Sequence, residues 1–313
     1  MMSIYPPNMV GAIDLGGTKI ETCLFDAQLR EFDRRRAPTP SDSYASLLDS
    51  IVGQCKWLRE IAGDPQLPIG IGIPGLIDPK TGLSNTSNLR SMGQPLESDL
   101  RLHLGDSIAV ENDCKCFTFS ESNGGACDGY RLVFGLIMGT GLGGGVCQHG
   151  ELMLHHNALA GEVGHIPLPA NLVQEWKLPL LKCGCGRVGC YETLVSGTGI
   201  RRLGKHVCGL DVKAQQVFEG NFCGVTSLQS VYTVWLELLC ALLDTIQLVL
   251  DPECIVFGGG LSHAPTLIED VSKRYEISLL QGIKAPIFKV ARFGDSSGIR
   301  GAAIHAQRKF RAG

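Results

Sequence analysis

The chain has 313 residues, of which 44% are hydrophobic and 19% are charged, and its net charge is −3. This length suffices for two domains, and the composition fits a well-buried globular protein. Without a basic excess, a nucleic-acid partner is not expected. Apolar runs such as Leu238–Leu243 are too short for a bilayer, which takes roughly 20 apolar residues. Residues 1–9 lack the features of a secretory signal, so we expect a cytoplasmic protein without membrane contact.

In the first half of the chain, apolar alternation and helical spacing predict a mixture of strands and helices. In chain order we expect a strand, turn and strand over 9–25, a helix over 41–61, a buried strand over 68–74, a surface loop over 78–93, a short strand over 107–110 and a helix from about 114.

The second half continues the same alternation of strands and helices, which favours the α/β class. We expect a hairpin from 132–138 and 145–148, a loop region over 149–179, a long apolar helix over 225–250, strands over 254–257 and 289–293, and a short helix over 299–307. The predicted division is a loose extension (1–9), a small α/β lobe (10–120) and a large α/β lobe (121–296), with the C-terminal helix, about 297–313, returning to the small lobe.

A glycine-rich turn follows the first predicted strand, at Asp14–Lys19. The carboxylate of Asp14 could hold a hydrated Mg²⁺. Gly16 and Gly17 could offer backbone N–H groups to a phosphate, because glycine has no Cβ in the way. Thr18 and Lys19 could reach a phosphoryl oxygen. The alternative is an ordinary hairpin turn.

A second glycine-rich turn carries Gly139, Thr140, Gly141, Gly143 and Gly144. It matches the pattern G-x-G-x-x-G, but no helix follows it, so a Rossmann dinucleotide site is not expected. Together with the first turn, it predicts a two-sided clamp on a nucleoside triphosphate in a cleft between two lobes.

A third cluster, Gly258, Gly259 and Gly260, follows a predicted strand. It fits either a plain strand-to-helix turn or bare backbone against which an adenine or ribose could lie.

The chain has 13 cysteines, and without an export signal a disulfide framework is not expected. Three of them, Cys183, Cys185 and Cys190, form a cluster 18 residues after His165. Three thiolates and one imidazole suit a closed, structural Zn²⁺ site. The alternative is unliganded loop thiols. A zinc ion there would also fix Glu162 and Glu192, which stand close by in the sequence.

Residues Glu111–Asp113 stand at the carboxyl end of a short apolar strand, where ligands gather in open α/β sheets. Asp113 could accept a proton from a sugar hydroxyl that attacks a γ-phosphate, and Asn112 could bond the same ligand. The alternative is an Asx cap for the following helix.

These motifs together resemble the ROK family of sugar kinases, over residues of about 10 to 305, and within it the bacterial N-acetylglucosamine kinases. The motifs are Asp14–Lys19, Gly72–Gly75, Asn112–Asp113, Gly139–Gly145, Gly161–His165, Cys183–Cys190, Gly258–Gly260 and Gly294–Gly301. The resemblance implies a two-lobed actin-like (ribonuclease H-like) ATPase fold. It also implies transfer of phosphate from ATP, with Mg²⁺, to the 6-hydroxyl of a hexose or N-acetylhexosamine.

The resemblance assigns Asp113 as the catalytic base and implies a homodimer. It assigns sugar contacts to Gly75, Asn88, Asn112, Glu162, His165 and Glu192, with His165 also a zinc ligand. Fructokinases, mannokinases and glucokinases share the motifs and stay open as alternatives. A non-catalytic sugar-sensing protein is a further alternative; the repressors of the family carry a helix-turn-helix ahead of the first turn, for which 13 residues before Asp14 leave no room.

Overall fold

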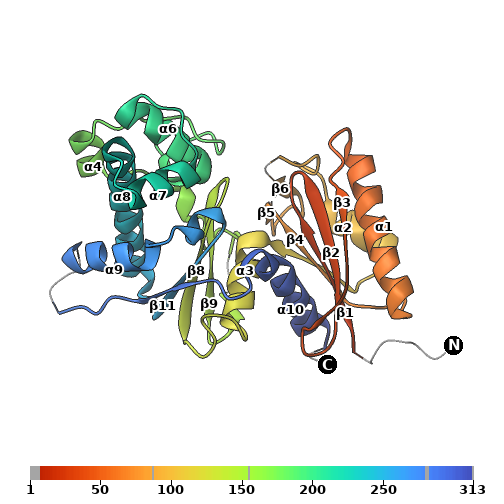
Figure 1. Cartoon of the computed structure of the whole chain (residues 1–313). Helices are drawn as coiled ribbons and strands as arrows, with labels where there is room; N and C mark the ends of the chain where they lie inside the picture. Colours follow the sequence, from red (N-terminus) through yellow and green to blue (C-terminus); the bar gives the residue numbers. More distant parts are fainter. Residues whose placement is uncertain (1–7, 87, 154–155, 279–281, 312–313) are drawn as a thin grey trace. The chain divides into compact units, whose positions relative to one another are not determined.

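The computed structural model describes residues 8–86, 88–153, 156–278 and 282–311, so most of the predicted extension lies outside the described residues (Figure 1). Its contacts divide the chain into two compact units. Unit 1 comprises Met1–Asn123, Glu151–Ala160 and Ser296–Gly313, and unit 2 comprises Gly124–Gly150 and Gly161–Asp295. Both units contain strands and helices, as expected for an α/β protein.

Unit 1 contains a five-stranded sheet in the order β3-β2-β1-β4-β7. The strands are β1 (Val10–Leu15), β2 (Lys19–Phe25), β3 (Glu31–Pro38), β4 (Ile69–Ile73) and β7 (Ile108–Asn112). The first three are antiparallel, whereas β1, β4 and β7 run parallel to one another. In the parallel part, Asp14 pairs with Gly72, and Gly72 pairs with Glu111.

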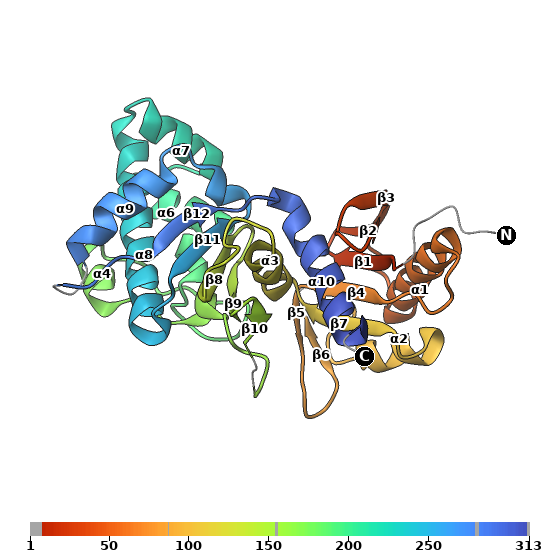
Figure 2. The same ribbon diagram turned by 90° about the horizontal axis from the view of Figure 1, so that it is seen from below.

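Helices cover both faces of this sheet (Figure 2). The helices are α1 (Tyr44–Ala62), α2 (Leu96–Leu104), α3 (Asp113–Ser122) and α10 (Ser297–Arg311). Unit 1 also contains the hairpin of β5 (Gly75–Ile77) and β6 (Ser84–Thr86) and the short strand β10 (Glu151–Leu152). Alternation along β1 separates two cores: Ile13 and Leu15 pack with α1 and α2, whereas Val10 and Ala12 pack with α3 and α10.

Unit 2 contains the strand order β9-β8-β11-β12, in which β8 and β9 form a hairpin and β11 pairs in parallel with β8 and β12. The strands are β8 (Leu132–Met138), β9 (Leu142–Gln148), β11 (Cys254–Gly258) and β12 (Ile287–Val290). The helices are η1 (Val163–His165), α4 (Ala170–Glu175), α5 (Glu192–Val195), α6 (Gly197–Cys208), α7 (Ala214–Phe222), α8 (Thr226–Leu250), η2 (Gly260–His263) and α9 (Leu267–Ser278). The short helix η3 (Gly294–Ser296) precedes α10.

Helix α8 is the one described helix that is long and apolar enough to cross a membrane. Uninterrupted apolar runs did not indicate this, because polar residues such as Glu237 divide the segment. Half of its most apolar window is buried within the structure, and it contacts α6, α7 and α9. The core helix of a globular protein has these properties too, so α8 is weak evidence for a membrane.

Several predicted elements are confirmed with small shifts of their ends. The helix over 41–61 is α1, whose N-cap Ser43 accepts a hydrogen bond from Ser46 N and whose C-cap Gly63 is left-handed. The predicted surface loop over 78–93 is wrong in part, because it contains the polar strand β6 with Ser84 and Thr86 buried. The sequence also missed β3, which is rich in charge and lacks apolar alternation.

Helix α10 packs against its neighbours at glycine positions. A Cβ on Gly301 would lie 1.7 Å from the carbonyl oxygen of Cys116 in α3, and a Cβ on Gly70 in β4 would lie 1.8 Å from the carbonyl oxygen of Ala302. Real Cβ atoms do not come this close to backbone atoms, so these glycines permit the packing of α10 on unit 1.

We expect Gly301→Ala to lower the free energy of unfolding by roughly 1–3 kcal/mol or more, because backbone must move to admit the methyl group. The matched control is Gly53→Ala in α1, where no atom lies within 4 Å of the added Cβ. There the same change should raise stability by roughly 0.5–1 kcal/mol through helix propensity. Urea unfolding measures both, and an equal response of the two variants would contradict the packing argument.

Candidate functional site

The carboxyl ends of β1, β4 and β7 form one edge of the sheet in unit 1. The register brings Asp14, Gly72 and the β7–α3 junction at Asn112–Asp113 to this edge. Two strand spacings of about 4.8 Å separate the backbones of β1 and β7, roughly 10 Å in all. Gly72 stands between them: its Cβ would lie 3.9 Å from the Cα of Asp113. The two predicted carboxylates therefore belong to one edge, and the smallest residue lies between them.

Asp14 lies on the α10 face of the sheet, as alternation along β1 requires. It is half-buried, and a Cβ on Gly298, in the first turn of α10, would lie 3.9 Å from its Oδ2 atom. A carboxylate close to a helix N-terminus is electrostatically favourable, because the first N–H groups of the helix carry partial positive charge.

Asn112 and Asp113 are held by hydrogen bonds at the start of α3. The buried Asn112 side chain accepts from Lys115 N (3.1 Å) and donates through Nδ2 to the carbonyl oxygen of Gly75 (3.0 Å). The alternative prediction of an Asx cap is thus correct for Asn112. The half-buried Asp113 carboxylate accepts from Cys114 N through Oδ1 (2.8 Å).

The first glycine turn is a tight hairpin between β1 and β2. Gly16 N donates to the carbonyl oxygen of Lys19 (2.9 Å), so this N–H group is used by the turn itself. Gly17 and Thr18 are exposed. Asn88 lies alongside, since a Cβ on Gly17 would be 3.5 Å from the Asn88 Cβ. The turn and Asn88 are therefore neighbours within unit 1.

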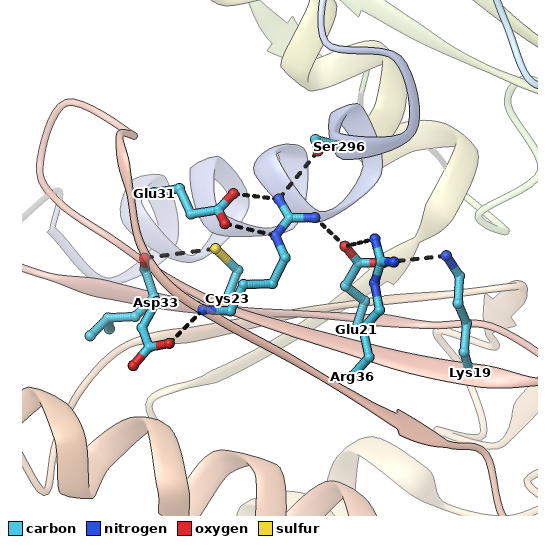
Figure 3. A network of polar contacts seen from close by, with 9 residues as sticks. Lys19, Glu21, Cys23, Glu31, Asp33, Arg36 and Ser296 are labelled. Carbon is cyan, nitrogen blue, oxygen red and sulfur yellow. Dashed lines mark hydrogen bonds and ion pairs between the residues drawn. The ribbon is translucent and has the colours of Figure 1, made fainter.

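Lys19 belongs to a charged network that the sequence motifs did not indicate (Figure 3). The buried Glu21 accepts from Lys19 Nζ (3.3 Å), from Arg36 Nη2 (3.1 Å) and from Arg34. Arg34 also donates to Ser296 Oγ (3.2 Å), just before α10. Burial alone would raise the pKa of Glu21, but the hydrogen bond from Arg36 and the charge of Arg34 lower it. The opposite charges of Glu21 and Arg36, which pair across β2 and β3, could have indicated this network. This pairing can be predicted only if β3 is recognised as a strand.

In unit 2, the second glycine turn connects β8 and β9. Gly139 N donates to the carbonyl oxygen of Gly141 (3.0 Å), and the carbonyl oxygen of Gly139 accepts from Gly197 N (2.7 Å). Leu142 N donates to Glu192 Oε2 (3.0 Å). A Cβ on Gly141 would lie 2.8 Å from that same oxygen. The Glu192 carboxylate therefore rests against the turn.

The other glycines of unit 2 bring backbones together around this turn. Gly143 and Gly144 lie inside β9, and a Cβ on Gly144 would lie 2.5 Å from the carbonyl oxygen of Gly135. Gly259 adopts φ +77°, and its Cβ would lie 2.6 Å from the carbonyl oxygen of Met138. Gly260, by contrast, has no atom within 4 Å of an added Cβ. The second and third glycine clusters are thus neighbours.

The predicted metal ligands of unit 2 also come together. One ligand atom from each of His165, Cys183, Cys185 and Cys190 lies within 4.8 Å of the others. Cys185 Sγ and Cys190 Sγ are 3.7 Å apart, and Cys183 Sγ is 3.6 Å from His165 Nδ1. Around a tetrahedral zinc, ligand bonds of about 2.3 Å to sulfur and about 2.0 Å to nitrogen give a sulfur–sulfur edge of about 3.8 Å and a sulfur–nitrogen edge of about 3.5 Å. The donor set therefore fits zinc in chemistry and in size.

Two carboxylates border this cluster. Glu162 Oε2 lies 3.8 Å from His165 Nε2, and Glu192 Oε1 lies 3.7 Å from Cys183 Sγ. Burial and then the neighbouring thiols raise the pKa of Cys190 to about 12. A cation in the cluster would oppose this effect, because a bound metal favours the thiolate form.

The predicted site residues thus form two groups. Unit 1 holds Asp14, the turn of Gly16–Lys19, Gly75, Asn88, Asn112 and Asp113, and unit 2 holds the turn of Gly139–Gly144, Gly258–Gly260, Glu162, His165, Glu192 and the three cysteines.

Comparisons with known proteins cover nearly the whole chain. A model of the ROK family matches residues 10–309. An N-acetylgalactosamine kinase from Shewanella sp. (strain ANA-3) is 37% identical over 297 residues, 95% of this chain and 96% of that protein. An N-acetyl-D-glucosamine kinase from Vibrio vulnificus (strain YJ016) is 37% identical over 303 residues, 95% of this chain and 98% of that protein.

Among solved structures, the ROK hexokinase of Thermus thermophilus matches with a TM-score of 0.85 and 28% identity, over 97% of this chain and all of that one (100%). The fold is accordingly the α/β, two-lobed actin-like ATPase fold that the resemblance implied. With the family model and full-length relatives in agreement, the chain belongs to the ROK family.

Proposed function

We propose that the chain is an ATP-dependent sugar kinase that phosphorylates the 6-hydroxyl of N-acetyl-D-glucosamine, with Asp113 as the general base. Relatives that are 35–37% identical over nearly their whole length are named N-acetyl-D-glucosamine kinases, which supports the substrate class. The observation that carries the proposal is the register that brings Asp14 and Asn112–Asp113 to one sheet edge. This edge of an open α/β sheet is where ligands bind.

In this proposal the residues of unit 1 perform the acid–base work. Asp113 accepts the proton of the sugar hydroxyl, and its bond to Cys114 N keeps the carboxylate oriented. Asn112, whose Nδ2 donates to the carbonyl oxygen of Gly75, would make a hydrogen bond to the sugar beside Asp113. Asp14 fits as the carboxylate that would hold a hydrated Mg²⁺, which prefers one or two carboxylates together with phosphate oxygens. When bound, Mg²⁺ would neutralise charge that develops on the phosphates.

The glycine turns and polar side chains complete the proposed binding groups. Gly17, Thr18 and Lys19 would contact phosphates from unit 1, and the clusters at Gly139–Gly144 and Gly258–Gly260 would contact the nucleotide from unit 2. Asn88, Glu162, His165 and Glu192 would bind sugar hydroxyls. Hydrogen bonds from sugar hydroxyls to the charged carboxylates of Glu162 and Glu192 would be strong and directional, which would help to fix the acceptor oxygen.

We expect Asp113→Asn to lower kcat by at least about 100-fold, because the amide cannot accept the hydroxyl proton. ATP consumption in the presence of N-acetyl-D-glucosamine and Mg²⁺ measures this. Asp64→Asn is the matched control, since Asp64 also accepts one backbone hydrogen bond, from Gln66 N at 2.8 Å. Turnover that survives in Asp113→Asn would remove Asp113 from the mechanism.

The acceptor is tested with a panel of N-acetylglucosamine, N-acetylgalactosamine, glucose, fructose and mannose. A relative named N-acetylgalactosamine kinase has the same 37% identity as those named for N-acetylglucosamine, so the C4 epimer is the main competitor. We expect the highest kcat/KM for N-acetylglucosamine. A preference for a sugar without the acetamido group would refute the substrate, and saturable sugar binding without ATP turnover would refute the kinase.

We further propose that His165, Cys183, Cys185 and Cys190 hold a structural Zn²⁺. Four protein ligands leave no open position for a reacting group, so the ion would shape the loop. Hydrogen bonds already join this loop to its neighbour: Leu168 N donates to Gly189 O (2.8 Å) and Tyr191 N to Ile166 O (3.0 Å). A zinc ion would add a fixed link between Glu162 and Glu192 through His165 and Cys183.

Zinc removal by a chelator, or Cys185→Ser, should loosen residues 160–192 and weaken sugar binding, because the carboxylates lose their shared anchor. Metal analysis, amide hydrogen exchange and calorimetric sugar binding measure the three effects. Cys223→Ser is the control, because Cys223 is an exposed thiol outside the cluster. Sugar affinity that is unchanged after the metal has gone would break the link between zinc and substrate.

The same family resemblance leads us to propose a homodimer that works in the cytoplasm, where ATP is available. Light scattering on the purified chain measures its mass in solution.

A further inference from the structure

Lys115 is a buried lysine directly behind the proposed catalytic residues. It stands in the first turns of α3, two residues after Asp113, and its side chain is 2% exposed. Burial of an ammonium group is unfavourable unless its charge and its donors are satisfied. The ammonium group of Lys115 therefore needs partners that balance its charge and accept its hydrogen bonds.

Two contacts of its ammonium group lead to the site. Lys115 Nζ lies 3.5 Å from Glu111 Oε1, at the end of β7, and donates to the carbonyl oxygen of Ala158 (2.8 Å). The same Glu111 Oε1 accepts a hydrogen bond from Asn112 N (2.8 Å). A continuous polar connection thus runs from the ammonium group through one carboxylate oxygen to the backbone that carries Asn112 and Asp113.

Lys115 reaches Asn112 by a second route. Its backbone N–H donates to Asn112 Oδ1 (3.1 Å), while Asn112 Nδ2 donates to the carbonyl oxygen of Gly75 (3.0 Å). Asn112 is thereby fixed at its backbone by Glu111 and at its side chain by Lys115 and Gly75. Because Asp113 is the next residue in the chain, the fixed position of Asn112 also restrains the backbone of Asp113.

The carbonyl oxygen to which Lys115 Nζ donates belongs to a strained residue. Ala158 has φ +59°, a left-handed conformation that is costly for a side chain other than glycine, and it is 6% exposed. The hydrogen bond from Lys115 helps to hold this conformation. Along the chain, Ala158 stands four residues before Glu162, one of the proposed sugar contacts.

Loss of Lys115 would remove the ion pair that holds Glu111 Oε1, and Glu111 has open space on one side. It borders a hollow of about 400 Å³ in unit 1 that His305, Arg308 and Lys309 of α10 also line. A carboxylate without its buried partner could turn into this hollow and release Asn112 N. The ion pair with Lys115 therefore favours the orientation in which Glu111 Oε1 accepts from Asn112 N.

We propose that Lys115 and Glu111 are positioning residues that orient the Asn112–Asp113 junction for phosphoryl transfer. The inference rests on the proposed kinase function. Its physical reason is that a general base must meet the acceptor hydroxyl within a narrow range of distance and angle, and misplacement by about 1 Å can cost about 100-fold in rate.

The first test is Lys115→Met, which keeps an unbranched apolar side chain one atom shorter than lysine and removes the charge. We expect kcat to fall at least about 10-fold, with KM for ATP and for N-acetylglucosamine changed by less than about 3-fold. Glu111→Gln should lower kcat as well, and the double variant should be no slower than the slower single variant, because both act through one interaction.

Arg59→Met is the control for a purely structural effect. Arg59 is a partly buried cation of α1 that donates to the carbonyl oxygen of Leu104 and to Ser107 Oγ (2.7 and 2.9 Å), on the opposite face of the sheet. It should lower the melting temperature and leave kcat unchanged. Lys115→Met with wild-type kcat, or with an effect on KM alone, would overturn the inference. If Lys115→Met fails to fold, Glu111→Gln decides in the same way.

Amide hydrogen exchange separates this inference from the kinase proposal, because it needs no activity. We expect faster exchange in residues 110–116 and 156–160 of Lys115→Met, with no change there in Arg59→Met. A wild-type chain without phosphoryl transfer would refute the proposed function alone. Unchanged exchange in Lys115→Met would refute the positioning role, whatever the activity.

Discussion

The parallel pairing of β1, β4 and β7 is the constraint on which the candidate site in unit 1 depends. Because Asp14, Gly72 and Glu111 share one register, the three strands end together, and the chain leaves each of them at the same edge. A shift of one residue would send Asp14 to the opposite face, into the apolar layer of α1 and α2. The register of these strands therefore brings three motifs that are separate in the sequence to one edge of the sheet.

Both units contain glycines at positions where two backbone segments approach each other closely. In unit 1, Gly70 and Gly301 admit α10 against β4 and α3, which brings the start of α10 to Asp14. In unit 2, Gly161 and Gly164 admit the segment around η1 against β9, where any Cβ would meet a backbone oxygen at 2.2 and 2.0 Å. Much of the glycine content of the motifs thus serves packing, and a smaller part leaves backbone open to a ligand.

Buried charge is the third feature, and it lies on both sides of Asp14 and Gly72 in the sheet of unit 1. Glu21 gathers Lys19, Arg34 and Arg36 on the β2–β3 ribbon, and Lys115 pairs with Glu111 behind Asn112. Such pairs add little net stability, since desolvation offsets attraction, but loss of one partner is costly because it leaves a buried charge without compensation. Their value here is orientation.

The sequence by itself determined the α/β class, the main hairpins, helix α1 and the residue types of the site, because periodicity and motif spacing are local properties. It missed β3 and β6, because their residues are mostly polar and show no apolar alternation, although each pairs with the strand that precedes it in the chain. The structure decided between alternatives that the sequence left open: Asn112 caps α3, and Gly16 N is used within its own turn. The burial of Lys115 against Glu111 had no signal in the sequence. These contacts are local, but the burial of Lys115 also depends on Ala158, whose carbonyl oxygen accepts from the ammonium group across 43 residues of sequence. Such a long-range partner has no signature in a short stretch of sequence.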